Sequence, residues 1–476
     1  MLAPPERGGN PANPAPPRST ADLTTFQLGA RKAAAAILTR PRSTRWLLDS
    51  DNDADGLTAA AVLALALLRV GHRFTIRPSR DKTEAHYHAL FAEPADGFIL
   101  LDKGTSHVAQ LAADPARKQR PVVVVDHHNV VAHPPADGEV HILNPRLCGL
   151  DGSRDASGAT TALALALELA GPAALAWAPI ALSGAVGDWQ HMGGWQGWNL
   201  HAIQEAEKAG HLKRVPMPRF IGVSLAEALS HARPAIPGLE GDPAASAAFL
   251  HQHQVDPDAE VEELDAEART RLVSAVVARH LAYGSRGEGL DRIVGPLEWN
   301  VKLDASLRQV FRMTDACGRE GNPQAAIAWL MGDASAKTDV TACFQSYRQA
   351  LASGVRALRD GGVKVHKAVQ VAWTERADYT GMVAGIGMTH VVADHERPLA
   401  VLAPRPDGKI QASTRGTHEQ VAAGLDLGAA VAKAAQAVGS EGGGHPVAAG
   451  AVLAKDKVGA FVAVLDDALL QQRGAA

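Results

Sequence analysis

The sequence has very little cysteine, and what it has is scattered. Cys148, Cys317 and Cys343 are the only three cysteines in 476 residues, and no two of them form a C-x-x-C pair. This pattern argues against a disulfide framework and against a structural zinc site. It suits a reducing compartment. The N-terminus also lacks a basic segment followed by an apolar one, so we expect a cytoplasmic protein.

Aromatic residues, long apolar runs and excess positive charge are also scarce. Only 4% of residues are aromatic although 46% are hydrophobic, so the core must be built from small aliphatic side chains. The stretch Ala59 to Leu68 is soon followed by Arg69 and His72, which indicates a core helix and no membrane association. The net charge of -4 excludes a globally basic nucleic-acid coat, but it leaves room for a local basic groove.

The length predicts two or three domains. Residues 1–20 are rich in proline and small polar residues, and we expect a disordered tail. From residue 21 to 194 short apolar strands alternate with helices, which predicts a parallel sheet with acidic residues at the carboxyl ends of its strands. The expected strands are 45–48, 74–77, 98–101, 122–125 and 141–143, and the expected helices are 57–70, 157–169 and 177–186.

The rest of the chain divides into three further segments. Residues 195–335 are expected to form a helical or irregular insertion, and 336–362 a long connecting helix. Residues 363–476 return to alternating strands and helices, which predicts a second, smaller α/β domain. We therefore expect two α/β lobes joined by a long helix.

Four carboxylates alternate over seven residues after the first expected strand: Asp49, Asp51, Asp53 and Asp55. In an extended segment they would share one face and repel each other unless a cation bound them. Acidic surface loops and helix caps give the same pattern. A calcium-binding EF-hand is disfavoured, because the twelfth position counted from Asp51 is Val62 and no bidentate Glu follows.

Three more segments place acidic residues or histidines at the ends of apolar elements. Asp102 follows one strand, and Asp126, His127 and His128 follow the four-valine strand. Asp188 follows a helix of small residues. One histidine can bind a metal while Asp126 orients a ring nitrogen from behind. Together, oxygen-rich ligands with one or two imidazoles favour a two-metal site for manganese or magnesium.

These segments, in order, resemble the motif series of the DHH phosphoesterase superfamily: DNDADG (51–56), LDKG (101–104), VVVVDHH (122–128) and GAVGDW (184–189). The segment GGGHPVAAG (442–450) resembles the signature of the DHHA1-type C-terminal domain. Residues 144–162 and 187–210 are similar to RecJ-like exonucleases, especially the archaeal-type branch. The resemblance implies an N-terminal DHH domain and a C-terminal DHHA1 domain.

The resemblance also implies roles for individual residues. Asp53 and Asp55 would each bind one Mn²⁺, Asp102 would bridge the two ions, and His127 and Asp188 would complete the second ion's ligands. His128 would contact the phosphate or assist the leaving oxygen, with Asp126 beside it. Relatives often carry a histidine where this chain has Asp49, and Asp51 matches the first acidic residue of the RecJ-type pattern. Either or both of these two could ligate a metal.

In the C-terminal domain the implied substrate contacts are Ser413, Arg415, Gly443, Gly444 and His445. Consecutive glycines let backbone N–H groups approach a phosphate, and Arg binds phosphates in a bidentate manner. Their alternatives are a flexible linker and an ordinary surface arginine. Trp189, Trp195 and Trp198 could stack unpaired bases, but core packing is favoured for this cluster. His86 and His88, near Arg80 and Lys82, could approach a phosphate or belong to a solvated loop.

The implied activity is two-metal hydrolysis of single-stranded DNA or RNA with Mn²⁺, or with Mg²⁺ in its place. Three alternatives stay open. The first is hydrolysis of small phosphoesters, namely short oligoribonucleotides, cyclic dinucleotides or 3′-phosphoadenosine 5′-phosphate. The second is a non-catalytic replication or repair scaffold, which the intact metal-ligand set disfavours. The third, an inorganic pyrophosphatase, is disfavoured because those relatives lack GGGH.

Overall fold

The computed structural model describes residues 20–131, 138–220, 224–232, 235–284, 293–392 and 394–475. The predicted disordered tail therefore lies outside the described residues, except for Thr20. The chain forms two compact units, Met1–Pro216 with Pro296–Cys343, and Met217–Gly295 with Phe344–Ala476. The boundary between them crosses three elements, β6 (Leu212–Pro218), β7 (Val294–Asn300) and α13 (Lys337–Gly361).

A five-stranded parallel sheet with the strand order β2-β1-β3-β4-β5 forms the centre of the first unit. Its strands are β1 (Arg45–Ser50), β2 (Arg73–Pro78), β3 (Gly97–Leu101), β4 (Val122–Val125) and β5 (Val140–Leu143). β1, β3 and β4 are almost entirely buried, as central strands covered on both faces should be. The predicted parallel sheet is confirmed.

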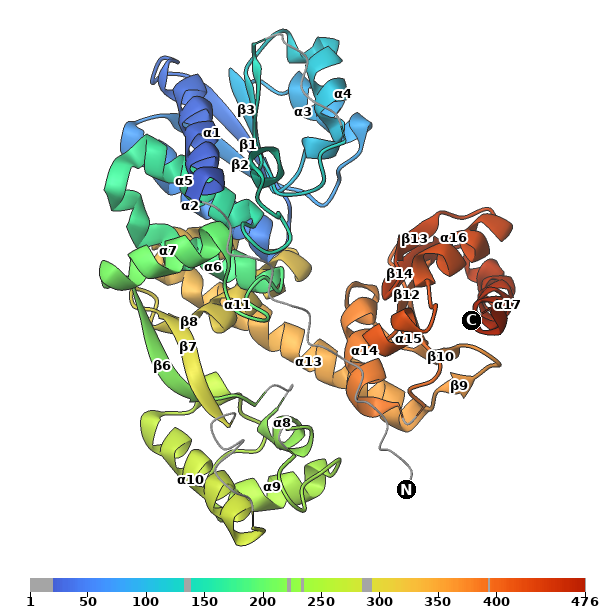
Figure 1. Ribbon diagram of the computed structural model, residues 1–476. Coiled ribbons are helices and arrows are strands. Elements are labelled where there is room, and N and C mark those ends of the chain that lie inside the picture. The colour runs from blue at the N-terminus through green and yellow to red at the C-terminus, as the bar shows by residue number, and fades with distance from the viewer. Residues whose placement is uncertain are drawn as a thin grey trace, which may run out of the picture. The chain divides into compact units, whose positions relative to one another are not determined.

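Helices cover both faces of this sheet (Figure 1). On one face, α3 (Glu84–Ala92) and α4 (Val108–Ala113) bury Phe91 and Leu111 against β3 and β4. The other helices of this part of the chain are α1 (Thr20–Leu38), α2 (Ala54–Val70), α5 (Gly158–Ala170), α6 (Ala178–Gly187) and α7 (Gly197–Lys208). The helices α2, α5 and α6 pack on one another.

Alanine is what lets α2 and α5 pack so extensively. Ala59, Ala60 and Ala64 of α2 have no exposed surface, and Ala159 and Ala162 of α5 have none either. Small side chains let two helix backbones approach closely, which accounts for a large core with few aromatic residues. The stretch Gly158–Gly187 is long and apolar enough to cross a membrane by composition, but its α5 and α6 pack on α2 as core helices do.

The residues predicted as an insertion contain strands that the sequence did not reveal. β6, β7 and β8 (Ala305–Ser306) form a three-stranded sheet in that order. Among the described residues of this segment the α-helices are α7, given above, and α8 (Leu225–Ser230), α9 (Pro243–Gln252), α10 (Ala266–Ala282), α11 (Leu307–Arg319) and α12 (Pro323–Met331). Residues 195–335 are divided between the two units, so they do not form one compact body. The predicted long helix is present as α13.

The second unit holds a six-stranded mixed sheet with the order β13-β14-β12-β11-β10-β9. Only β10 and β11 are parallel neighbours; the other pairs are antiparallel. The strands are β9 (Lys364–Val365), β10 (Gln370–Trp373), β11 (Leu399–Pro404), β12 (Ile410–Arg415), β13 (Gly442–His445) and β14 (Ala448–Leu453). The helices that follow α13 are α14 (Thr380–Ile386), α15 (His418–Ala422), α16 (Leu427–Ala437) and α17 (Val458–Ala475), and α8, α9, α10 and most of α13 also belong to this unit.

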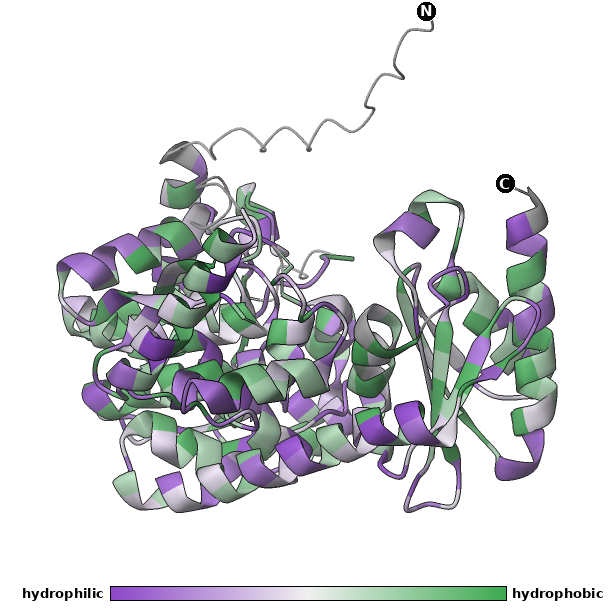
Figure 2. Cartoon of the chain, turned by 90° about the horizontal axis from the view of Figure 1, so that it is seen from below, coloured by the Kyte–Doolittle hydropathy of each residue, from purple (hydrophilic) through white to green (hydrophobic). Residues whose placement is uncertain are grey.

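α16 and α17 supply the helical residues of a hydrophobic core cluster that includes strands of this sheet. Val431, Phe461 and Leu465 are fully buried in one cluster with the strand residues Leu402 and Ala412. α17, which ends at the C-terminus, carries hydrophilic and hydrophobic residues along its length (Figure 2). Such an amphipathic helix buries one face and leaves the other in water. The predicted α/β character of both lobes is confirmed.

Candidate metal centre

The ends of β1, β3 and β4 bring acidic residues and histidines to one edge of the parallel sheet. Backbone hydrogen bonds between neighbouring segments continue past the strand ends. Asp51 N donates to Leu101 O (3.0 Å), and Asp102 N donates to Val125 O (2.8 Å). Asp126 N donates to Leu143 O (3.1 Å). These backbone bonds fix the residues at the strand ends relative to one another.

Asp102 is held in an unusual backbone conformation. Its φ of 60° is positive, which is uncommon for a residue other than glycine, and its side chain is buried. The first residue of α5 must be small to leave room for it, because a Cβ atom on Gly158 would lie 2.7 Å from Oδ1 of Asp102. Strain of this kind is typical of functional sites.

Seven side chains from separate parts of the chain gather into three overlapping groups. In each group the candidate ligand atoms lie within 4.8 Å of one another. The groups are Asp51, Asp53 and Asp102; Asp55, His127 and Asp188; and Asp102, His127 and His128. Because the groups share Asp102 and His127, they form one continuous cluster rather than three sites.

The N-terminus of α5 holds the carboxylate of Asp55. Oδ1 accepts hydrogen bonds from Ser157 Oγ (2.7 Å) and Ala159 N (3.1 Å), and Oδ2 accepts one from Gly158 N (2.6 Å). Backbone N–H groups and the helix dipole favour a negative charge here. Asp55 is thereby fixed in position while Oδ2 still lies 3.8 Å from Nε2 of His127.

The ring of His127 is oriented so that one nitrogen faces the carboxylates. Nδ1 lies 2.5 Å from the carbonyl oxygen of Gly152, so Nδ1 carries the proton and donates it there. Nε2 lies 3.2 Å from both Asp102 Oδ1 and Asp188 Oδ2. Burial lowers the pKa of His127, but its contacts with Asp102, Asp188 and Asp55 outweigh burial and raise that pKa well above its usual value.

Asp126 contacts both of the histidines that follow it in the chain. Its buried Oδ1 accepts from the backbone N–H of His127 (2.7 Å) and lies 2.7 Å from Nδ1 of His128, while Oδ2 accepts from Thr105 N (2.9 Å). Burial would raise the pKa of Asp126, but the hydrogen bond with His128 and the charges of both histidines hold it well below its usual range. Asp126 is therefore a stable anion that orients His128, whose side chain is half exposed.

The carboxylates of the cluster lie so close together that the protein does not neutralise their combined negative charge. Asp53 keeps an exposed side chain, yet desolvation by the surrounding protein, followed by the charge of Asp51, raises its pKa to about 6. Burial, and then the charge of Asp55, raise the pKa values of Asp102 and Asp188 well above the usual range. Buried carboxylates in this number need cations, and oxygen ligands with imidazole fit Mn²⁺ or Mg²⁺. The donor set therefore fits a divalent-metal centre.

The structure does not bring Asp49 into this cluster. Lys103 Nζ donates to Oδ1 of Asp49 (2.7 Å), and His86 Nε2 lies 2.9 Å from its Oδ2. Asp49 and the Lys103 side chain are both fully buried. Sequence reasoning missed Lys103 as a partner, although it directly follows Asp102. Asp51 stays in the cluster and is also paired with Lys82 (2.5 Å).

In the second unit, the sheet register aligns the predicted substrate-binding residues in neighbouring rows. Across β12, β14 and β13, Ser413 is paired through Gly450 with Gly443, and Arg415 through Ala448 with His445. The GGGH segment is thus an edge strand. Gly444 requires glycine, because its φ is 149° and a Cβ atom would lie 2.5 Å from Ala448 O.

Ser413 and Arg415 have different immediate surroundings. Ser413 Oγ is bonded to Thr380 Oγ1 (2.8 Å), and burial lowers the pKa of Arg415. A Cβ atom on Gly381 would lie 2.8 Å from Nη2 of Arg415. Their roles toward a substrate stay a prediction.

The three clustered tryptophans have different environments. Trp198 is buried and donates from Nε1 to Thr160 O (2.8 Å), as a core residue does. Trp189, next to Asp188, is 65% exposed, and Trp195 is partly exposed. The preference for core packing therefore fits Trp198 and does not fit Trp189. His86 and His88, for which a solvated loop was the alternative, lie on helix α3, where His86 contacts Asp49 and His88 lies 3.1 Å from Asp114.

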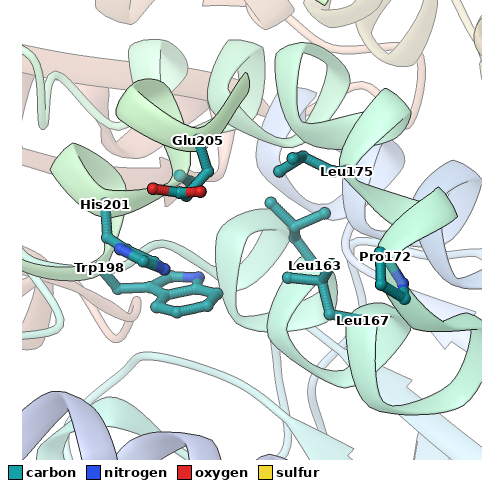
Figure 3. Close-up of a pocket in the computed structure, with 8 residues that line it drawn as sticks. Leu163, Leu167, Pro172, Leu175, Trp198, His201 and Glu205 are labelled. Atoms are coloured by element: carbon teal, nitrogen blue, oxygen red, sulfur yellow. The ribbon is translucent and has the colours of Figure 1, made fainter. Parts of the chain in front are cut away.

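A cavity of about 270 Å³ opens beside Trp198 but has none of the metal-centre residues in its lining (Figure 3). Leu163 and Leu167 of α5 and Leu175 contribute an apolar wall, and His201 and Glu205 are its polar residues. The cavity is therefore distinct from the carboxylate cluster, and the chemistry of the cluster does not involve it.

Two domain families match the chain in the regions just described. Residues 47–184 match the DHH family, N-terminal domain, and residues 348–471 match the DHHA1 domain. The chain belongs to the DHH/DHHA1 superfamily. The matched DHH segment contains six of the seven clustered side chains, and the DHHA1 segment contains the rows of Ser413, Arg415 and the GGGH strand.

Relatives of this superfamily match the chain to different extents. "Uncharacterized protein MJ0831" of Methanocaldococcus jannaschii is 25% identical over 432 residues, covering 88% of this chain and 92% of the relative. The single-stranded-DNA-specific exonuclease RecJ of Thermus thermophilus is 31% identical over 224 residues, covering 44% of this chain. That match spans only 31% of the RecJ sequence.

Solved structures share the fold. RecJ of Thermus thermophilus, solved in complex with Mn²⁺, has a TM-score of 0.59 at 19% identity and covers 96% of this chain and 56% of RecJ. CDC45 of Entamoeba histolytica has a TM-score of 0.62 at 12% identity and covers 94% of this chain and 99% of CDC45. The fold of this chain is thus RecJ-like.

Proposed function

We propose that the protein is a divalent-metal-dependent phosphodiesterase that removes nucleotides from an end of single-stranded DNA or RNA. The observation that carries this proposal is the cluster around His127, where one imidazole nitrogen faces Asp102 and Asp188 at 3.2 Å and Asp55 at 3.8 Å. Such a set of carboxylates around one imidazole suits two metal ions sharing a ligand. The 31% identity with an exonuclease specific for single-stranded DNA supports the substrate class.

In this proposal each clustered residue has a defined task. Asp53, Asp55, His127 and Asp188 would hold the metals, Asp102 would be the ligand shared between them, and Asp51, whose carboxylate is paired with Lys82, would help to hold one ion. Asp49 stays outside, because Lys103 and His86 occupy both of its carboxylate oxygens. Two bound Mn²⁺ ions, or Mg²⁺ ions, would lower the pKa of a water molecule and neutralise the charge that develops on the phosphate.

The remaining chemistry belongs to His128. Asp126 fixes its Nδ1 at 2.7 Å, which leaves Nε2 on a half-exposed ring to reach a substrate. From there His128 donates a hydrogen bond to the phosphate or a proton to the leaving oxygen. In the second unit, Arg415, Ser413, Gly443, Gly444 and His445 bind the nucleic-acid backbone, Arg415 through its guanidinium. The cysteines are free, in keeping with a cytoplasmic enzyme.

A product ladder tests this function. The protein with Mn²⁺ is incubated with 5′- or 3′-labelled single strands of DNA and RNA, from dinucleotides to roughly 40-mers. The proposal predicts stepwise shortening of long strands from one end, and loss of that activity in Asp102→Ala and His127→Ala. Cleavage of dimers to tetramers alone would identify a small-phosphoester hydrolase. No hydrolysis of any of these by a folded, metal-loaded protein would support the scaffold.

A further inference from the structure

The loop that follows Asp188 presents one exposed aromatic ring to solvent beside the metal centre. Trp189 is the next residue after the proposed ligand, is 65% exposed and has a positive φ of 60°. A bulky residue rarely adopts this conformation, so the surrounding contacts must enforce it. Trp189 N donates to Val186 O (3.1 Å), and Met192 N donates back to Trp189 O (3.0 Å).

Three rings of this loop form a continuous ladder. Trp189 and His191 are stacked with centroids 6.3 Å apart and planes 20° from parallel, and His191 and Trp195 lie 5.9 Å apart. Trp195 is fixed at the far end, since its Nε1 donates to Glu298 Oε1 (3.1 Å). Trp189 leaves most of its surface open, so the ladder has an uncovered end.

The loop is tied rigidly to the metal centre. Buried Gln190 donates from Nε2 to Gly152 O (3.0 Å) and accepts at Oε1 from Asn199 Nδ2 (2.7 Å). The carbonyl of Gly152 is the same one that orients His127. A rigid support keeps the rings at a fixed place relative to the reacting phosphate, which a stacking surface requires.

Positive charge flanks the ladder. Arg154 is exposed, and its Nη2 lies 4.0 Å from where a Cβ atom on Gly193 would be. Arg308 of α11 is close enough to add to burial in lowering the pKa of His191. Aromatic rings interleaved with arginines are an arrangement by which proteins hold single-stranded nucleic acid, since every nucleotide has a base face to stack and a phosphate to neutralise.

We propose that Trp189, His191 and Trp195 form a stacking platform for unpaired nucleobases next to the scissile phosphate. This inference rests on the proposed function and deepens it. Bases in a duplex already stack on their neighbours and are not free to cover the platform, so it selects single strands. Packing in the core does not explain Trp189, because Trp198 takes the buried position in the same cluster.

The test compares strands with and without bases. Binding is measured by fluorescence anisotropy, with Mg²⁺ present, to a phosphorothioate single strand that resists hydrolysis and to an abasic strand with the same number of phosphates. The variants are Trp189→Ala, Trp195→Ala and Trp189→Phe. Tyr283→Ala is the control, since Tyr283 is 66% exposed and belongs to neither proposed site.

The platform predicts that Trp189→Ala weakens binding of the normal strand roughly 5- to 100-fold, while the abasic strand binds both proteins equally. Trp195→Ala weakens it less, Trp189→Phe keeps most of the affinity, and Tyr283→Ala changes neither strand. Equal losses on the two strands, or no loss, would overturn the platform. So would a wild-type protein that does not bind the normal strand.

Failure of the platform and failure of the proposed function give different results. A wild type that shortens labelled strands, while Trp189→Ala binds normally, keeps the function and overturns the platform. A wild type that binds bases through Trp189 but hydrolyses no strand keeps the platform and overturns the function.

Discussion

Lys103 Nζ lies 2.7 Å from Oδ1 of Asp49, and neither side chain has any exposed surface. The pair adjoins the metal centre through Asp102, the residue before Lys103. Burial lowers the pKa of Lys103, although Asp49 opposes this shift. Such a pair stabilises a fold only while both partners are present, because a single buried charge is expensive.

Lys103→Met should therefore lower the free energy of unfolding by about 3–5 kcal/mol, measured by urea denaturation without metal. Replacing both partners, in Asp49→Asn with Lys103→Met, should recover part of that loss. Arg31→Ala breaks an exposed pair with Glu168 and should cost less than about 1 kcal/mol. A Lys103→Met protein as stable as the wild type would contradict this account of the pair.

Two isosteric substitutions distinguish the roles of Asp49 and Asp53. Asp53→Asn should weaken Mn²⁺ binding by about tenfold or more, whereas Asp49→Asn should weaken it much less, since Asp49 is bonded to Lys103 and His86. Isothermal titration calorimetry measures both. Equal losses in the two variants would place Asp49 among the ligands.

Metal binding should depend on pH through Asp53. Its folded pKa of about 6 lies above the usual 3.8, so the metal-free fold holds this proton more tightly than the unfolded chain does. The ionised group therefore destabilises the metal-free fold as pH rises through about 6. Since a metal requires the ionised form, binding should release protons below that pH.

We accordingly expect apparent Mn²⁺ affinity to rise between about pH 5 and 7, and the metal-induced increase in melting temperature to be larger at pH 7.5 than at pH 5.5. Calorimetry in buffers of different ionisation enthalpy counts the released protons. Affinity that is independent of pH across this range would contradict the crowding of these carboxylates.

Asp126 and His128 should affect turnover more than metal affinity. His128→Ala should lower kcat by about 10²-fold or more, and Asp126→Asn should lower kcat because His128 loses its orienting carboxylate. The measurement is steady-state hydrolysis at saturating Mn²⁺. If His128→Ala instead loses metal and keeps its turnover when metal is restored in excess, His128 is a ligand and not a substrate contact.

Gly184 should be needed for metal binding although it binds nothing itself. A Cβ atom there would lie 2.4 Å from Thr58 Oγ1 and 2.5 Å from Asp55 Oδ1, so Gly184→Ala should displace Asp55. We expect Mn²⁺ affinity to fall by about 10- to 100-fold. Gly459→Ala in α17 is the matched control, with no atom within 4 Å of its Cβ, and should keep full affinity.

The sequence was sufficient to predict features that follow from local residue patterns. It was not sufficient to predict contacts between residues that are far apart in the chain. Asp102, His127 and Asp53 could be found because each follows an apolar strand, and parallel strands end at one edge. Lys103 as the partner of Asp49, and Gln190 as the link to Gly152, depend on contacts that no spacing encodes. β6 and β7 were missed for the same reason, since their pairing joins segments about 80 residues apart.

The central claim is that the cluster around Asp102 and His127 is a two-metal centre. Counting bound Mn²⁺ by electron paramagnetic resonance, while hydrolysis of a labelled single strand is followed in the same samples, tests it most directly. The account predicts two ions per wild-type chain. It also predicts activity that rises only as the second ion binds, and loss of both in a folded Asp102→Asn protein. Full activity with one ion, or an Asp102→Asn protein that keeps two ions and its activity, would contradict it.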